Sequence, residues 1–228
     1  MSRTISIAGS GTDVGKTWVA CRLIQDLRAG GLAVTPRKPV VSGVDDDDVG
    51  SSDTDRLIDA AGLGLDQRDA ISPWRFIDPV APNEAARRVG VVLDFDAIVA
   101  ACAINDSDVV VVETAGGVMS PLTDDTTQLS LLDAVNAPVL LVVDGRYLGW
   151  ISHTLTALFA LRAAELDVVA VVVNRGLVAA LTTLTSIAVV NADDRAAIAD
   201  LARGALLKTP TTSSALRRLP RQAGRRID

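Results

Sequence analysis

The apolar positions of this 228-residue chain gather in short, continuous runs rich in β-branched residues. Runs that lack polar alternation are typical of parallel strands buried on both faces. Each run is followed by polar or glycine-rich residues, which predicts a strand that ends in a loop. The predicted strands cover residues 4–8, 33–36, 109–112, 138–143, 168–173 and, more weakly, 187–190.

Stretches with helical spacing alternate with these runs. Strands that alternate with helices predict an α/β fold of the doubly wound kind, with a mainly parallel sheet and helices on both faces. We expect one P-loop domain over residues 1–228, with a tail from residue 209 that frays. Two polar or proline-rich stretches, 44–52 and 71–83, are expected to be loops. The predicted helices are 16–29, 53–61, 83–88, 94–103 and 153–164.

Composition narrows the class of protein. Apolar residues make up 49% of the chain but aromatic residues only 3%, so valine, alanine, leucine and isoleucine must fill the core. The formal net charge of −6 gives no reason to expect nucleic acid as a partner. No apolar run is long enough to span a membrane, and no leader pattern precedes the first strand. Cys21 and Cys102 have no metal-binding spacing, so we expect two buried thiols in a cytoplasmic protein.

The most informative motif is a glycine-rich loop between the first strand and the first helix. It reads Gly9-Ser10-Gly11-Thr12-Asp13-Val14-Gly15-Lys16-Thr17. Backbone N–H groups in such a loop, together with a helix N-terminus, bind phosphate oxygens. Lys16 then bridges the β- and γ-phosphates and the Thr17 hydroxyl binds Mg²⁺. The loop is one residue longer than the usual P-loop, because Gly9 lies six positions before Gly15; the alternative is a glycine-rich turn with an unrelated lysine.

Further candidates follow the other predicted strands. Glu113 ends the four-valine strand, where a carboxylate can bind Mg²⁺ directly or through water, although it can also be an exposed strand-end residue. Lys38 precedes a proline that fixes its direction, and it is either an anion ligand or a surface lysine. Asp53 and Asp55 begin a helix, where a metal ligand and a helix cap are both consistent with the pattern. His153 is the single histidine, which excludes a catalytic triad or a zinc site built on histidines.

Taken together, these motifs resemble the dethiobiotin synthetase family over residues 4–176. Five segments carry the resemblance besides the long phosphate loop: Arg37-Lys38-Pro39-Val40-Val41-Ser42-Gly43, Ser52-Asp53-Thr54, Ser72-Pro73-Trp74-Arg75-Phe76 with Ala81-Pro82, Val112-Glu113-Thr114-Ala115-Gly116-Gly117, and Leu148-Gly149-Trp150-Ile151-Ser152-His153-Thr154. Asn174 also looks like the asparagine with which that family reads adenine. The resemblance implies an ATP- and Mg²⁺-dependent carbon–nitrogen ligase of biotin biosynthesis.

The resemblance also implies roles for individual residues. The substrates would be 7,8-diaminopelargonate, CO2 or bicarbonate, and ATP. The enzyme would be a homodimer, because the helix that begins near Gly149 serves the partner subunit's site in that family. The implied catalytic residues are Lys16 and Lys38, and the implied Mg²⁺ ligands are Thr17, Asp53 and Glu113. The implied ATP-binding residues are Thr12, Asp13, Val14, Gly15, Lys16, Thr17, Trp18, Asp53, Glu113, Thr114, Ala115, Gly116, Asn174 and Arg175. The implied substrate-binding residues are Thr12, Lys38, Ser42, Gly149, Trp150, Ile151 and Ser152.

Two departures from the family pattern and three other hypotheses remain. Thr114 replaces a glycine and adds a side chain near the phosphates, and the family's late adenine-contacting segment is not visible after residue 179. A partitioning-type ATPase switch would carry a second lysine at the position of Gly11. A cobyrinate-type amide synthetase would carry a glutaminase domain, for which this chain is too short. A nucleotide-binding regulator without catalysis is also consistent with the sequence.

Overall fold

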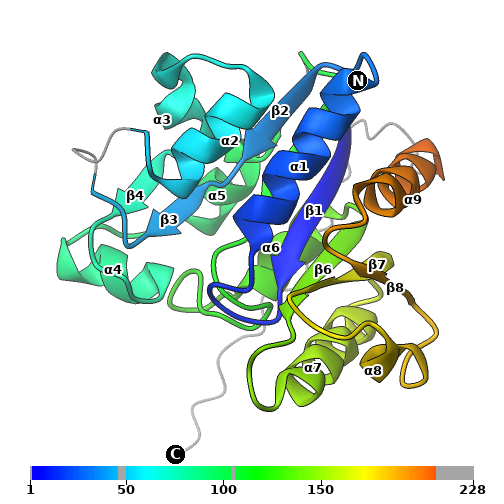
Figure 1. The fold of residues 1–228 in the computed structure, drawn as a ribbon. Helices are drawn as coiled ribbons and strands as arrows, with labels where there is room; N and C mark the ends of the chain where they lie inside the picture. Colours follow the sequence, from blue (N-terminus) through cyan, green and yellow to red (C-terminus); the bar gives the residue numbers. More distant parts are fainter. Residues whose placement is uncertain (1, 46–49, 104–105, 209–228) are drawn as a thin grey trace, which may run out of the picture.

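The computed structural model describes residues 2–45, 50–103 and 106–208 of the chain. A six-stranded sheet with the order β2-β5-β1-β6-β7-β8 forms its centre, and every neighbouring pair is parallel. This confirms the predicted α/β fold, and the ribbon is drawn in Figure 1. The strands are β1 (Arg3–Gly9), β2 (Val34–Arg37), β5 (Val109–Glu113), β6 (Val139–Asp144), β7 (Val168–Asn174) and β8 (Ala188–Asn191).

Helices cover both faces of this sheet. Within β5, Val109 and Val111 pack with one group of helices while Val110 and Val112 pack with another, because neighbouring side chains of a strand point to opposite faces. The first group comprises α1 (Lys16–Ala29), α2 (Asp53–Ala61) and α9 (Arg195–Lys208). The second comprises α4 (Pro82–Arg88), α5 (Phe95–Ala101), α6 (Gln128–Val135), α7 (Trp150–Ala163) and the short α8 (Ala179–Thr182).

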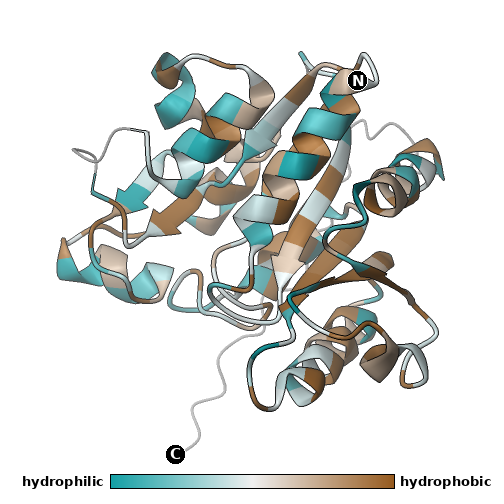
Figure 2. Ribbon diagram, in the orientation of Figure 1, coloured by the Kyte–Doolittle hydropathy of each residue, from teal (hydrophilic) through white to brown (hydrophobic). Residues whose placement is uncertain are grey.

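The strands form the apolar centre of the molecule. Every residue of β5 and of β6 is buried, and Figure 2 shows hydrophobic colour concentrated along the central strands. Full burial of one valine side chain stabilises the fold by about 1.5–3 kcal/mol. The valine runs therefore fix which segments become the inner strands of the sheet.

The stretch 71–83, expected to be a loop, contains regular structure. The strand β4 (Trp74–Phe76) pairs in parallel with β3 (Val40–Ser42), and α4 begins at Pro82. The interpretation as a loop was wrong because strands of three residues leave no periodic pattern. A proline at the first position of a helix is also favourable rather than disruptive. Two short helical segments, η1 (Leu65–Gln67) and α3 (Arg68–Ile71), lead into this region.

Two further helices, α6 and α9, were not predicted. α9 contains Gly204 and many alanines, and α6 is apolar on most sides, so neither has a clear 3.6-residue pattern. The predicted last strand at 187–190 is confirmed as β8. The acidic residues 46–49 and the tail from residue 209, both interpreted above, lie outside the described residues.

Both cysteines carry free thiols; Cys102 is buried as expected, whereas Cys21 is half-buried. Across the described ranges, no helix is both long enough and apolar enough to cross a bilayer. Because all six strands run in the same direction, their carboxyl ends lie at one edge of the sheet. Lys38, Glu113, Asp144 and Asn174 stand at or just beyond those ends, together with the loop that follows β1. Ligands of doubly wound sheets bind at this edge.

Candidate active site

The loop that follows β1 is held between the neighbouring strands. The Ser10 N–H donates to the Val142 carbonyl and the Val118 N–H donates to the Gly9 carbonyl, each at 3.0 Å. The loop then turns into α1, with Gly15 as the residue that precedes the first helical position. The Lys16 ammonium donates to the Gly11 carbonyl at 2.8 Å, so this side chain folds back over the loop. The N-terminus of α1 and the loop amides thus form the cradle that a phosphate chain requires.

Two glycines of the loop are required by their surroundings. Gly15 has φ +96°, and a Cβ atom there would lie 2.2 Å from Nδ2 of Asn174. A Cβ atom at Gly9 would lie 2.9 Å from Cδ of Lys16. A side chain at Gly9 would therefore displace Lys16, and one at Gly15 would both collide with Asn174 and strain the backbone, because positive φ angles favour glycine.

Four polar side chains converge beside the loop. The Lys38 ammonium donates to Oε1 of Glu113 at 2.7 Å and to the Thr17 hydroxyl at 3.3 Å, and it also forms an ion pair with Asp53. The Thr17 hydroxyl donates to the same Glu113 oxygen at 2.7 Å. Lys38 is 5% exposed and Glu113 is 1% exposed. Side chains from β5, α1, α2 and the residue that follows β2 therefore meet at one point.

These contacts shift the pKa values of the charged groups. Burial alone would lower the pKa of Lys38, but the charges of Glu113 and Asp53 outweigh it and raise that pKa. Burial would raise the pKa of Asp53, whereas the charge of Lys38 and its hydrogen bond lower it. Burial, followed by the charge of Lys38, lowers the pKa of Lys16 to about 8. At neutral pH, Lys38 is thus a fixed cation and Lys16 is a cation that can lose its proton in mild alkali.

The two aspartates at the start of α2 have separate functions. Ser52 caps the helix: its hydroxyl accepts from the Asp55 N–H at 3.1 Å, and Oδ2 of Asp55 accepts from the Gly50 N–H at 2.9 Å. Asp55 is buried against Arg68 at 2.6 Å. Asp53 takes no part in the cap and faces Lys38 instead. The choice between the two left open by the sequence therefore falls on Asp53 for the site and on Asp55 for the cap.

A cavity of about 700 Å³ opens beside this cluster. The phosphate loop, Ser42, Gly43 and the proline-rich residues 79–82 all contribute to its lining. The stretch 79–82 thus forms the wall that the sequence indicated. The predicted site residues that line the cavity are Thr12, Asp13, Gly15, Lys16, Thr17, Trp18, Lys38, Ser42, Asp53, Glu113, Ala115 and Gly116.

Comparison with known proteins decides the family. The family described as "AAA domain" matches residues 3–203. An ATP-dependent dethiobiotin synthetase of Phenylobacterium zucineum is 49% identical over 175 residues, which is 74% of each chain. One from Caulobacter vibrioides is 48% identical over 179 residues, covering 77% of this chain and 81% of the relative. This chain belongs to the ATP-dependent dethiobiotin synthetase family.

Membership of that family confirms the expected ATP-dependent ligase and the resemblance drawn from the motifs. Among solved structures, the septum site-determining protein MinD of Pyrococcus horikoshii, crystallised with Mg-ADP, is similar with a TM-score of 0.50 and 18% identity. The likeness covers 88% of this chain and 86% of that one, and it shows that the two share the fold.

The donor set at the dethiobiotin synthetase site suits Mg²⁺. Glu113 Oε2 is buried and has no hydrogen-bond partner, whereas Oε1 accepts from two donors. Mg²⁺ in nucleotide sites is typically bound by one or two carboxylates and completes its shell with phosphate oxygens and water. Asp53 and Glu113 supply two carboxylates and Thr17 a hydroxyl. No group of three or more His, Cys, Asp or Glu side chains that could hold a metal occurs in the described part of the chain.

Several predicted site residues of this family member do not line the cavity. Val14 is buried beneath the loop, and the Thr114 hydroxyl donates to the Ile7 carbonyl at 3.4 Å. Thr114 therefore lies against β1 rather than beside the phosphate position. The residues Gly149, Trp150, Ile151 and Ser152 form the start of α7 and are also absent from the cavity lining. Their assignment to a substrate stays a prediction.

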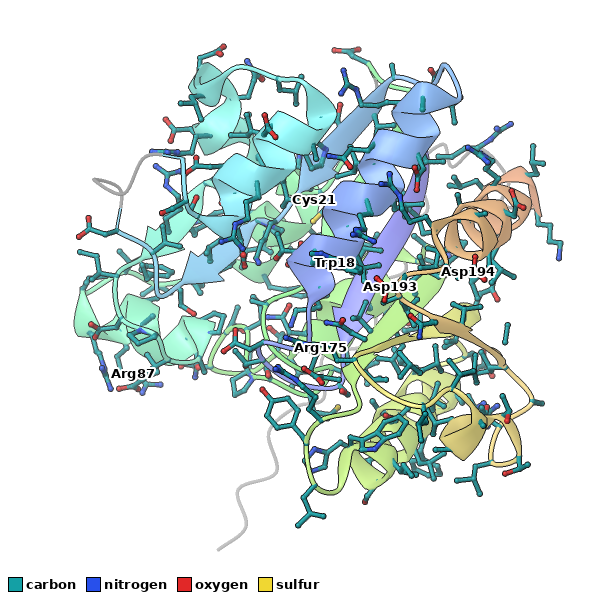
Figure 3. The ribbon with its side chains drawn as sticks, viewed as in Figure 1. Trp18, Cys21, Arg87, Arg175, Asp193 and Asp194 are labelled. Atoms are coloured by element: carbon teal, nitrogen blue, oxygen red, sulfur yellow. The ribbon has the colours of Figure 1, made fainter. Side chains whose placement is uncertain are left out.

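Asn174 and Arg175, two residues expected to bind ATP, form hydrogen bonds to backbone carbonyls of the phosphate loop. Asn174 donates to the Val14 carbonyl at 3.0 Å. Arg175 donates to the Asp13 carbonyl at 3.3 Å and pairs with Asp144 at 2.5 Å. The Arg22 guanidinium lies 3.6 Å from the centre of the Trp18 ring. Trp18 is labelled near the start of α1 in Figure 3.

Arg56 and Ser120 are among the cavity residues that the sequence analysis did not single out. Arg56 follows Asp53 by three positions on α2, a spacing that puts both on one helix face. Ser120 accepts from the Gly117 N–H at 2.8 Å and thereby holds the turn after β5. The helical spacing could have revealed Arg56, but no pattern indicated Ser120.

Proposed function

We propose that this protein uses ATP to close the ureido ring of dethiobiotin from 7,8-diaminopelargonate and CO2. The observation that carries the proposal is the convergence of Lys38, Glu113 and Thr17 beside the phosphate loop, at the mouth of a cavity large enough for a second substrate. A P-loop that served nucleotide binding alone would not need a second buried lysine at this point.

The reaction has three steps. One amine of the substrate adds to CO2 and loses a proton, which gives a carbamate. A carbamate oxygen then attacks the γ-phosphorus of ATP, the bond to ADP breaks, and a carbamic–phosphoric anhydride forms. The second amine attacks the carbonyl carbon, and phosphate leaves as the ring closes. Each step needs positioning and charge neutralisation rather than an imidazole base.

The side chains of the site fit these steps. Lys16 and the loop amides would hold the phosphates in line. Lys38 stays protonated beside the cavity, so it would neutralise the carbamate as it approaches the γ-phosphate. Thr17, Asp53 and Glu113 would hold Mg²⁺, which offsets charge on the phosphate oxygens when it is bound. Ser42, which also lines the cavity, would contact the diamine or the carbamate.

The substrate carboxylate would bind at the start of α7 of a partner subunit. The first turn of this 14-residue helix presents backbone N–H groups, and such termini bind carboxylates. Leu148 is fully exposed and Phe159 is 76% exposed on the same element and its approach. Exposed apolar side chains of this size suit an interface with a second copy. A homodimer would bring this helix to the cavity that it does not line within its own chain.

The test is a product assay with diaminopelargonate, bicarbonate, Mg²⁺ and ATP. We expect ADP, phosphate and a ureido product in equal amounts, and we expect Lys38→Ala to abolish turnover while nucleotide still binds. Substrate-dependent ADP release without a ureido product would identify a different acid-activating ligase. Unchanged turnover in Lys38→Ala would reject the role of that residue.

A further inference from the structure

The ammonium group of Lys38 lies among oxygen atoms that would also coordinate a divalent metal ion. It contacts Oε1 of Glu113, the Thr17 hydroxyl and the Asp53 carboxylate. These are the same three side chains to which we assign Mg²⁺. The present inference rests on the proposed function only for the identity of that metal.

Burial makes the two cations alternatives rather than neighbours. The Lys38 side chain is 6% exposed and that of Glu113 is 1% exposed, so solvent can screen little of the repulsion between an ammonium and a divalent ion. The Lys38 ammonium and a metal bound to the same Glu113 oxygen would stand within a few ångströms of each other. Oε2 of Glu113 is buried without a hydrogen-bond partner, and it belongs to a carboxylate that Lys38 already holds through Oε1.

We propose that Lys38 is the counter-ion of these carboxylates before metal binds and that the divalent cation replaces it there. Before the nucleotide binds, Lys38 keeps Asp53 and Glu113 together and neutralised. When the metal arrives with the nucleotide, the lysine leaves these carboxylates and turns into the cavity that it lines with Ser42. The acid group of the second substrate thus meets a free ammonium only after the metal nucleotide is in place.

This arrangement differs from a lysine that merely ties α2 to β5. A purely structural ion pair would persist when metal binds, so the ammonium would stay on Glu113 and Asp53. A resident counter-ion competes with the metal and leaves these carboxylates when the metal binds, and its removal strengthens metal binding. Metal affinity therefore tests the competition between the two cations, and the position of the ammonium in the metal-bound protein separates the two alternatives.

The first measurement is the affinity for Mn²⁺ without nucleotide. The concentration of free Mn²⁺ is determined from its electron paramagnetic resonance signal. We expect Lys38→Met to bind Mn²⁺ about tenfold or more tightly than the unmodified protein, because a competing cation has been removed. The double variant Lys38→Met/Glu113→Gln should lose that gain. Lys208→Met, at the end of α9, is the matched control and should bind like the unmodified protein. Equal or weaker binding by folded Lys38→Met would overturn the proposal.

The second measurement is made on the unmodified protein, and variants serve only to assign its signals. The chain contains three lysines, Lys16, Lys38 and Lys208, so the ¹⁵N-labelled ammonium signals can be assigned with single arginine variants. We expect the Lys38 signal, protected by its ion pairs in the free protein, to shift and lose protection when Mg²⁺ and ADP are added. A signal that keeps its position and protection would overturn the proposal. Neither measurement uses the diamine, so a failed ureido assay and a failed counter-ion test are distinguishable.

Discussion

The side-chain amide of Asn174 donates a hydrogen bond of 3.0 Å to the carbonyl of Val14 and fills the space beside Gly15. The end of β7 thus holds the phosphate loop in place through these contacts with Val14 and Gly15. The loop holds its path because Gly15 is left-handed and because Asn174 leaves no room for a Cβ atom there. Nucleotide binding should therefore depend on this pair as much as on the lysine that follows it.

Gly15→Ala should strongly weaken nucleotide binding. The new Cβ atom would collide with Asn174, and the positive φ alone costs about 1–3 kcal/mol. We expect the affinity for ADP to fall by about two orders of magnitude, since the amides of the loop must move away from the phosphate positions. Isothermal titration calorimetry with Mg²⁺ and ADP checks this.

Gly31→Ala is the matched control for that substitution. Gly31 also has a positive φ, +86°, but no atom lies within 4 Å of the position of its Cβ. It should reduce the free energy of unfolding by about 1 kcal/mol and leave the affinity for ADP unchanged. Similar nucleotide affinities in the two variants would contradict the role given to the contact between Gly15 and Asn174.

Asp53→Asn should change the metal requirement of nucleotide binding. The aspartate lies in the cluster with Lys38 and takes no part in the helix cap. We expect the Mg²⁺ concentration for half-maximal binding of ADP to rise about tenfold, because one of two carboxylates is lost. An unchanged Mg²⁺ requirement would exclude Asp53 as a ligand.

Asp55→Asn should reduce stability instead. Burial would raise the pKa of Asp55, but the hydrogen bonds from Arg68, Ser52 and Gly50 lower it below the ordinary value. Breaking this buried pair should lower the free energy of unfolding by about 3 kcal/mol at pH 7. The stabilisation is complete above the unfolded-state pKa, about 3.9, and is lost as the pH falls through the folded-state pKa.

Denaturant unfolding between pH 7 and pH 2 measures this effect. The difference in stability between the unmodified protein and Asp55→Asn should narrow below about pH 4. Asp69→Asn provides a control, because Asp69 pairs with Arg75 at 2.9 Å but is 89% exposed at its side chain. That substitution should change the stability by less than about 0.5 kcal/mol. A difference for Asp55→Asn that stays constant down to pH 2 would contradict the lowered pKa.

Lys16 should make nucleotide binding sensitive to alkaline pH. Its pKa of about 8 in the free protein must rise when phosphate binds, because the anion stabilises the charged form. Above about pH 8, ADP binding should therefore take up a proton and weaken by up to about tenfold per pH unit. Calorimetry at pH 9 in buffers of different ionisation enthalpy measures that uptake. Lys16→Met should show none, and proton-independent binding by the unmodified protein would contradict the assignment.

Much of the site could be predicted because its parts are local in sequence. The phosphate loop lies between a strand and a helix, and Glu113 directly follows four valines. One short segment of sequence therefore indicates both the functional residue and the helix or strand that positions it. A parallel sheet then brings strand ends together without further information. This logic explains why Lys38, Thr17 and Glu113 were expected to meet and do so.

The sequence could not reveal features that depend on three-dimensional partners. Asp53 and Asp55 are chemically identical, and only their contacts in three dimensions show that Asp55 belongs to the helix cap whereas Asp53 faces Lys38. Thr114 was expected to add bulk beside the phosphates, but its side chain points to Ile7. The strands β3 and β4 exist through their mutual pairing, which no local pattern encodes.

The measurement that tests the central claim most directly is the fate of oxygen from labelled CO2. The enzyme is mixed with diaminopelargonate, Mg²⁺, ATP and freshly prepared C¹⁸O2, and the phosphate is analysed by mass spectrometry before the label exchanges with water. If a carbamate oxygen attacks the γ-phosphorus at the phosphate loop and Lys38, the released phosphate carries one labelled oxygen. Phosphate without label, formed together with the ureido product, would contradict that account.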